Sequence, residues 1–157
     1  MVRENVLIAI DPGTKKSAFA VFSLRGKLLR YQSVDMVKGF KAFLLIAMRE
    51  HGTMVVENQH CRSRQAYKSL VLARGMIQGF FKLFRWKIIE VHPSTWRCGL
   101  FGGRNPKREE AQAKARQFVR RRLGLSIPDQ DEVDAVCMGL YGCGVRAKGG
   151  QRERRKR

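Results

Sequence analysis

An apolar segment that is interrupted once, by a carboxylate and a tight turn, most constrains how this chain can fold. The segment IAIDPGTKKSAFAVF spans residues 8–22. Its first half predicts a buried strand that ends near Asp11, and the Pro-Gly pair that follows is typical of a turn. A second strand is expected at 17–24, and the turn RGK leads to a third at 28–33. Three short apolar strands joined by turns require a sheet that other elements cover.

Helix and strand patterns alternate in the rest of the chain. A helix is expected from 36, capped by Asp35 and ended by Gly52, and a strand at 53–57 follows it. A helix at 64–84, a strand at 86–91 and a short helix from 93 come next. After a loop that contains Gly99, Gly102, Gly103 and Asn105, we expect a basic helix at 106–123 and a last helix at 129–141. This order predicts an α/β fold with a five-stranded mixed sheet and helices on both faces.

Length and composition favour one domain followed by a tail. The chain has 157 residues, 44% of them hydrophobic, which is enough for a single core. We expect the domain to cover 1–144 and the basic segment 145–157 to be disordered. No apolar run is long enough to span a bilayer, and the first residues lack the pattern of a signal peptide. We therefore expect a cytoplasmic protein, in the nucleoid or in a host cytoplasm.

The charge of the chain points to a polyanionic partner. Thirty-two Lys and Arg residues oppose 13 Asp and Glu residues, for a formal charge of +19. A field of this size attracts nucleic acid. An anionic membrane is disfavoured because there is no basic amphipathic helix with a bulky aromatic face. The four cysteines form no Cys-x-x-Cys pair, which disfavours a zinc site.

Acidic residues in so basic a chain are informative because each one repels the expected ligand. Asp11 ends the first strand, and Glu57 ends the strand TMVVE. If these two strands are adjacent and parallel, both carboxylates lie at the same edge of the sheet. The carboxyl edge is where open α/β sheets place their sites.

A second acidic group opens the last helix, in the segment PDQDEVDAV. Asp131 and Asp134 are three residues apart and share a helix face, so we interpret them as an exposed pair. Asp129 and Glu132 have the spacing of a capping box. Convergence of Asp11, Glu57 and the exposed pair would create strong repulsion, which bound cations relieve. Oxygen ligands favour Mg²⁺ or Mn²⁺, and two such ions roughly 3.5–4 Å apart can clamp a phosphodiester for in-line attack by water.

Local roles can explain the same acids. Asp11 could cap a turn, Glu57 could form an ion pair at a strand end, and the remaining acids could simply begin a helix. The residue pattern alone leaves the catalytic and the local interpretation both open.

Five segments together resemble a known family. IAIDPGTKKSAFAVF, MVVENQ, LARGMIQGF, VHPSTWR and DEVDAV occur in the order and spacing of the RuvC-type Holliday junction resolvases, over about residues 7–142. The resemblance implies an RNase H-like fold and a homodimer formed through the helix at 64–84. It also implies Mg²⁺-dependent, paired, symmetric nicking of four-way DNA junctions that leaves 5′-phosphate and 3′-hydroxyl ends.

The matching positions carry the family's functional residues. The resemblance implies that Asp11, Glu57, Asp131 and Asp134 are the catalytic and metal-binding residues. It further implies two Mg²⁺ ions per active site, with Mn²⁺ as a substitute.

Two features depart from the family pattern. After Glu57 the chain reads NQHCRSRQAY, in which only His60 or Tyr67 could replace the aromatic residue that bacterial members commonly place near the junction centre. The chain also carries more Lys and Arg than a compact bacterial member, which fits a phage or otherwise divergent form.

Several basic side chains are expected to contact DNA because they follow the acidic strand ends or begin the basic helix, where backbone N–H groups also favour phosphate. They are Lys15, Lys16, His60, Arg62, Arg64, Lys68, Arg104, Lys107, Arg108 and Lys114.

Two alternative functions remain open on the sequence. One is another RNase H-like nuclease that acts on branched DNA or RNA. The other is a non-catalytic nucleic-acid-binding module with the same fold. An actin-like or sugar-kinase ATPase, which IAIDPGT also resembles, needs two such domains, and 157 residues are too few.

Overall fold

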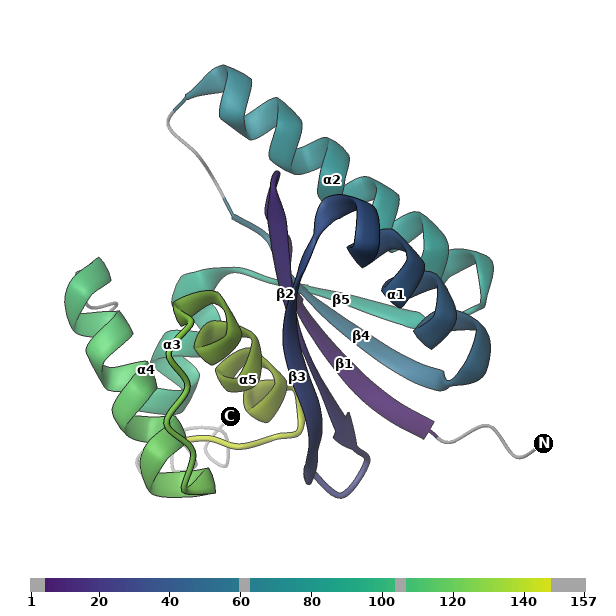
Figure 1. The fold of residues 1–157 in the computed structure, drawn as a ribbon. Coiled ribbons are helices and arrows are strands. Elements are labelled where there is room, and N and C mark those ends of the chain that lie inside the picture. The colour runs from purple at the N-terminus through teal and green to yellow at the C-terminus, as the bar shows by residue number, and fades with distance from the viewer. Residues whose placement is uncertain (1–4, 60–62, 104–106, 148–157) are drawn as a thin grey trace, which may run out of the picture.

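The computed structural model describes residues 5–59, 63–103 and 107–147 (Figure 1). Its strands are β1 (Asn5–Asp11), β2 (Lys16–Ser23), β3 (Leu28–Asp35), β4 (His51–Glu57) and β5 (Lys87–Val91). Its helices are α1 (Met36–Arg49), α2 (Arg64–Leu83), α3 (Pro93–Phe101), α4 (Arg108–Leu123) and α5 (Gln130–Gly142). None of the helices in these ranges has the length and hydropathy needed to cross a bilayer.

The five strands form one mixed sheet in the order β3-β2-β1-β4-β5. β1 lies at the centre, antiparallel to β2 and parallel to β4, and β5 continues the parallel half. Ile10 of β1 pairs with Val56 of β4. The next residues, Asp11 and Glu57, therefore emerge side by side at the carboxyl edge, as the strand pattern predicts.

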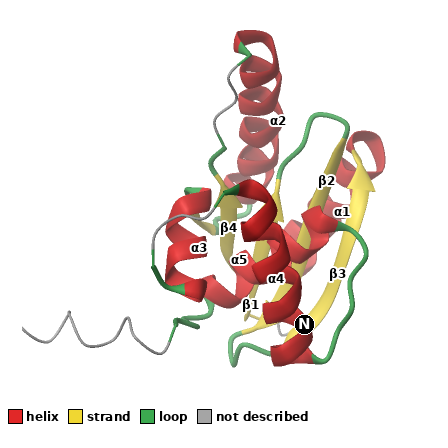
Figure 2. Cartoon of the chain, turned by 90° about the vertical axis from the view of Figure 1, so that its left-hand side faces the viewer, coloured by secondary structure: helices red, strands yellow, loops and turns green. Residues whose placement is uncertain are grey.

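Helices cover both faces of the sheet, which confirms the predicted architecture (Figures 1 and 2). Alternate residues of β1 point to opposite faces. Val6, Ile8 and Ile10 pack in a cluster with α1 and α2. Leu7 and Ala9 belong to the other cluster, which α3, α4 and α5 complete. Burial on both faces explains why the first strand is a nearly continuous apolar run.

α5 lies closest to the sheet. All its residues from Val133 to Leu140 are buried. A Cβ added at Gly139 would lie 2.1 Å from the ring of Phe22, so this glycine permits the close approach. The helix that carries Asp134 is therefore fixed against β1 and β2.

Two local predictions were wrong, those for Gly52 and Gly99. α1 ends at Arg49, and Gly52 lies inside β4 with φ 150°, where an added Cβ would lie 1.8 Å from the Val6 carbonyl oxygen. Gly52 is thus required because β4 approaches the backbone of β1 closely at this point, and not because a helix ends there. Asp35 is the last residue of β3 and directly precedes Met36, the first residue of α1, so it stands where a cap of that helix is predicted. Gly99 belongs to α3, where it leaves room for the Tyr141 ring.

Candidate active site

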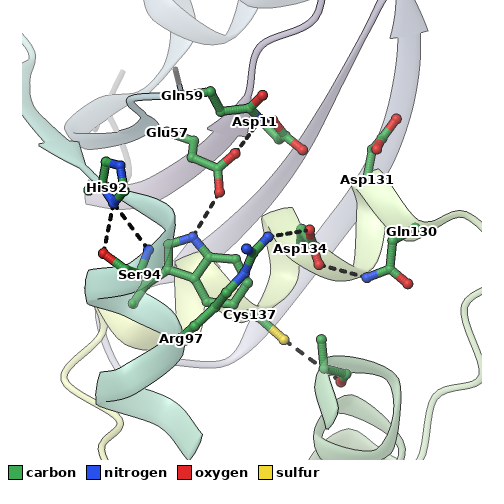
Figure 3. Close-up of polar contacts among 12 residues, drawn as sticks. Asp11, Glu57, Gln59, His92, Ser94, Arg97, Gln130, Asp131, Asp134 and Cys137 are labelled. Carbon is green, nitrogen blue, oxygen red and sulfur yellow. Dashed lines mark hydrogen bonds and ion pairs between the residues drawn. The ribbon is translucent and has the colours of Figure 1, made fainter. Parts of the chain in front are cut away.

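Three buried carboxylates meet at the carboxyl edge of the sheet (Figure 3). Asp11 and Glu57 come from the ends of β1 and β4, and Asp134 comes from the first turns of α5. Their exposed fractions are 8%, 2% and 9%. Asp131 lies at the rim, with half of its side chain exposed. The structure thus brings all four predicted acids together, but Asp134 is buried and the prediction of an exposed pair was wrong.

The pKa values of Asp11 and Asp134 are raised by burial and by the negative charges of the neighbouring carboxylates. Burial raises the pKa of Asp11 well above its ordinary value, and the negative charges of Glu57, Asp134 and Asp131 raise it further. Burial also raises the pKa of Asp134 to about 6, although a hydrogen bond from Gln130 and the charge of Arg97 oppose the shift. Anionic charge is costly at this edge of the sheet unless a cation or a proton balances it.

Gln59 is a member of the cluster that the sequence reasoning missed. Its Nε2 donates to Asp11 Oδ1 at 2.6 Å and also to Glu57 Oε2. Alternate residues of an extended segment point to the same side, so the Glu-x-Gln spacing is the signal that could have identified it.

Two further donors reach the cluster from α3. Trp96 Nε1 donates to Glu57 Oε1 at 2.9 Å, and Arg97 Nη2 lies 3.5 Å from Asp134 Oδ2. Gln130 Nε2 donates to Asp134 Oδ1 at 2.7 Å. No sequence pattern marks these contacts, because they depend on how α3 packs beside β4 and α5.

The start of α5 differs from the predicted capping box. Asp129 is the N-cap, and its Oδ1 accepts from the backbone N–H groups of Asp131 and Glu132. Glu132 does not return to Asp129 and accepts instead from the backbone N–H of Ser33 at 2.8 Å. Glu132 therefore ties α5 to β3, because the side chain extends toward the sheet.

The donor set fits a hard divalent cation. Asp11, Glu57, Asp131 and Asp134 offer oxygen only, and the Gln59 amide group already lies between two of them as a partial positive charge. Among the described residues, no three His, Cys, Asp or Glu side chains are arranged as a ready ion cage. Gln59, Trp96, Arg97 and Gln130 contact the oxygens of Asp11, Glu57 and Asp134, so an ion that binds these oxygens would replace some of these contacts.

The predicted DNA-contacting residues fall into three groups. Lys15, Arg64, Lys68, Lys107 and Arg108 are exposed. Two others are paired with acids: Lys16 Nζ lies 2.5 Å from Asp129 Oδ2 and 3.2 Å from Asp131 Oδ2, and Lys114 Nζ lies 2.6 Å from Glu110 Oε1. His60, Arg62 and Arg104 lie outside the described residues, as do 148–157 of the predicted tail.

The raised pKa of Asp134 gives a pH prediction for protein kept in a chelator. The folded state holds the Asp134 proton up to about pH 6, whereas the unfolded state loses it near 3.8. The burial of Asp134 therefore lowers the free energy of unfolding as pH rises through this window. We expect Asp134→Asn to gain about 1–3 kcal/mol relative to the wild type between pH 4.5 and 7.5. Urea denaturation at both pH values checks this, and an unchanged difference would contradict it.

Comparison with known proteins first defines the class of fold. No protein-family model matches the sequence. The chain superposes on RuvC of Thermus thermophilus with a TM-score of 0.70 at 20% identity, covering 86% of this chain and 91% of that one. It superposes equally on the same protein in complex with a Holliday junction substrate, with a TM-score of 0.69, 19% identity and coverages of 87% and 90%. The fold is RNase H-like, as the resemblance implies.

The sequence itself is similar to a particular enzyme. Over 159 residues it is 27% identical to the crossover junction endodeoxyribonuclease RuvC of Protochlamydia amoebophila (strain UWE25). The similarity covers 89% of this chain and 91% of that protein. This similarity, which extends over most of both chains, confirms the resemblance to RuvC-type resolvases.

Proposed function

We propose that this chain is a structure-selective endonuclease that resolves four-way DNA junctions by paired symmetric nicks, leaving 5′-phosphate and 3′-hydroxyl ends. The observation that carries the proposal is the meeting of Asp11, Glu57 and Asp134 at one sheet edge of a chain with a formal charge of +19. The similarity to RuvC, which one solved structure describes bound to a Holliday junction, supports the choice of substrate.

The four acids are proposed to be the catalytic residues. Asp11 and Glu57 would share one Mg²⁺ ion, and Asp131 and Asp134 would complete two ion sites, with Mn²⁺ as a substitute. Bound ions would neutralise the scissile phosphate and activate the attacking water. The burial of Asp11, Glu57 and Asp134 removes competing water from three of the four carboxylates. Asp131, at the exposed rim, lies on the side from which a DNA strand can approach.

The start of α4 is the best candidate for gripping the DNA backbone. Lys107 is the N-cap residue of α4 and Arg108 its first residue, and both are exposed. Backbone N–H groups at a helix start favour a phosphate. Neither residue has an ion pair among the described residues, whereas Lys16 and Lys114 do.

Lys107→Ala is expected to weaken junction binding by about threefold to tenfold without preference for the DNA sequence. One lost phosphate contact also reduces the slope of log affinity against log salt concentration by about 1. Titration of a labelled junction at several salt concentrations, in Ca²⁺, measures both quantities. Lys27→Ala, which changes an exposed lysine in the turn before β3, is the control; an equal effect of both would indicate that only total charge matters.

The symmetric cut requires two active sites, which we propose a homodimer supplies through α2. Figures 1 and 2 show the start of α2 standing away from the sheet. One face of the helix is buried through Leu70, Ala73, Ile77 and Phe81. The opposite face carries the exposed apolar residues Leu72, Met76 and Leu83. An exposed stripe of this kind on a helix is typical of a surface that a second copy covers.

Incubation of the purified protein with a fixed four-way junction, with and without Mg²⁺, tests the proposed function. Paired nicks at symmetric positions, seen only with metal, are expected. Flap DNA and an RNA–DNA hybrid of matched length, tested in parallel, distinguish a junction resolvase from another RNase H-like nuclease. Binding to junctions without any cut in Mg²⁺ or Mn²⁺ would instead support a non-catalytic module.

A further inference from the structure

Two consecutive side chains of α3, Trp96 and Arg97, direct their N–H groups at the carboxylate cluster. Trp96 has no exposed surface, and its Nε1 donates to Glu57 Oε1 at 2.9 Å. The guanidinium carbon of Arg97 lies 5.0 Å from the centre of the Trp96 ring, and Nη2 of Arg97 lies 3.5 Å from Asp134 Oδ2. Figure 3 shows the guanidinium of Arg97 directed at Asp134 from α3.

The second tryptophan of the chain shows what a core indole ordinarily does. Trp86 is also buried, and its Nε1 donates to the backbone carbonyl of Ala47 at 3.3 Å. Such a bond satisfies a buried donor and needs no carboxylate. Trp96 donates at a shorter distance to a candidate metal ligand. The need to fill the core therefore explains why a large ring is buried at Trp96. It does not explain why the Trp96 N–H donates to the Glu57 carboxylate.

The two carboxylate oxygens of Glu57 accept hydrogen bonds from different donors. Oε1 is held by the indole, and Oε2 accepts from Gln59, which also bonds to Asp11. Through Gln59, Oε2 and not Oε1 is linked to Asp11. A charge-assisted bond to a rigid, buried indole fixes the carboxylate plane more firmly than a flexible donor can.

We propose that Trp96, braced by Arg97, is a positioning residue that holds Glu57 by Oε1 so that Oε2 alone is offered to a divalent ion. The inference rests on the proposed function, because it assumes that Glu57 binds the ion. It assigns Arg97 a supporting role: its charge balances Asp134 while its guanidinium covers the indole. The pair would make α3 part of the active-site support, where the sequence shows only an ordinary helix.

Tryptophan fluorescence tests the contact without measuring nicking. In Trp86→Phe, Trp96 is the only tryptophan of the chain. Indole emission responds to charge near the ring, so loading Glu57 with Mg²⁺ is expected to change the emission of Trp96 in a saturable manner. K⁺ at matched ionic strength is expected to have no such effect. Adding Asp11→Asn removes a proposed ion ligand but leaves the Trp96–Glu57 bond, and it should shift or abolish the Mg²⁺ response.

Trp96→Phe then tests positioning directly, because it keeps a ring and removes the N–H. We expect Mg²⁺ affinity, measured by calorimetry, to fall about 10–100-fold. The turnover rate should fall while junction affinity in Ca²⁺ stays within about twofold. Trp86→Phe is the matched control, since it changes a tryptophan of similar burial, and it should retain wild-type Mg²⁺ affinity.

The outcomes separate this inference from the proposed function. Wild-type Mg²⁺ affinity in Trp96→Phe, or a Trp96 emission that Mg²⁺ leaves unchanged while the protein cuts junctions, would overturn the role of Trp96 and leave the nuclease proposal intact. A wild-type protein that neither binds Mg²⁺ nor cuts would overturn both. If Trp96→Phe does not fold, the fluorescence titration in Trp86→Phe still decides the question.

Discussion

Asp11→Asn is expected to reduce junction nicking by at least about 10³-fold while the protein still binds the junction. Asp11 lies at the centre of the cluster, where it is within electrostatic reach of Glu57, Asp134 and Asp131. An amide in its place keeps the shape but removes the charge that is proposed to hold a divalent ion. Single-turnover cleavage of a labelled four-way junction in Mg²⁺ measures the loss.

The same substitution should make the chelated protein more stable. The pKa of Asp11 is raised mainly by burial, so its charged form is unfavourable in the fold, and Asn removes that cost. We expect a melting temperature several degrees above that of the wild type in a chelator, and a smaller rise on adding Mg²⁺. Asp35→Asn, at the exposed end of β3, is the control for both measurements. Full nicking by Asp11→Asn would exclude the proposed active site.

Leu72→Glu is expected to convert the proposed dimer into a monomer. Leu72 is 66% exposed in the single chain and lies on the apolar stripe of α2. A carboxylate placed between two copies of this stripe would be desolvated without a partner, at a cost of several kcal/mol. Light scattering coupled to gel filtration should show the dimer mass for the wild type and the monomer mass for Leu72→Glu over the same concentration range.

Loss of the dimer should uncouple the two cuts. A monomeric variant is expected to nick one strand at a time, so plasmids carrying an extruded cruciform would accumulate as nicked circles and not as linear products. Leu24→Glu is a close control, because Leu24 is 67% exposed but lies in the turn between β2 and β3. A wild-type monomer that makes paired cuts, or an unchanged dimer in Leu72→Glu, would contradict the α2 interface.

The parts of the site that follow from the strand pattern were predictable. Asp11 and Glu57 each end a buried apolar strand, and parallel pairing of β1 with β4 then places them together. Helical periodicity also identified α2, which begins at Arg64 as predicted and ends one residue before Phe84. In these cases a local pattern and the packing of the fold agree.

The remaining parts depend on how helices pack, and no local pattern records that. Asp131 and Asp134 share a helix face, yet only Asp134 is buried, because the enclosed part of α5 begins at Val133 and Asp131 lies in the exposed first turn before it. Glu132 has the spacing of a cap partner but extends to Ser33 of β3 instead. Trp96 has the sequence environment of a core residue, and only the position of α3 beside β4 brings its N–H to Glu57.

The deep burial of α5 also bears on when the protein can act. Asp134 sits in a helix whose following residues, through Leu140, are all enclosed by the sheet and its neighbours. The cluster of four carboxylates therefore cannot form in a nascent or partly unfolded chain. Such a chain nevertheless keeps the positive charge that is expected to attract DNA. We therefore expect incompletely folded molecules to bind nucleic acid without cutting it, and nuclease activity to appear only when the core around α5 has formed.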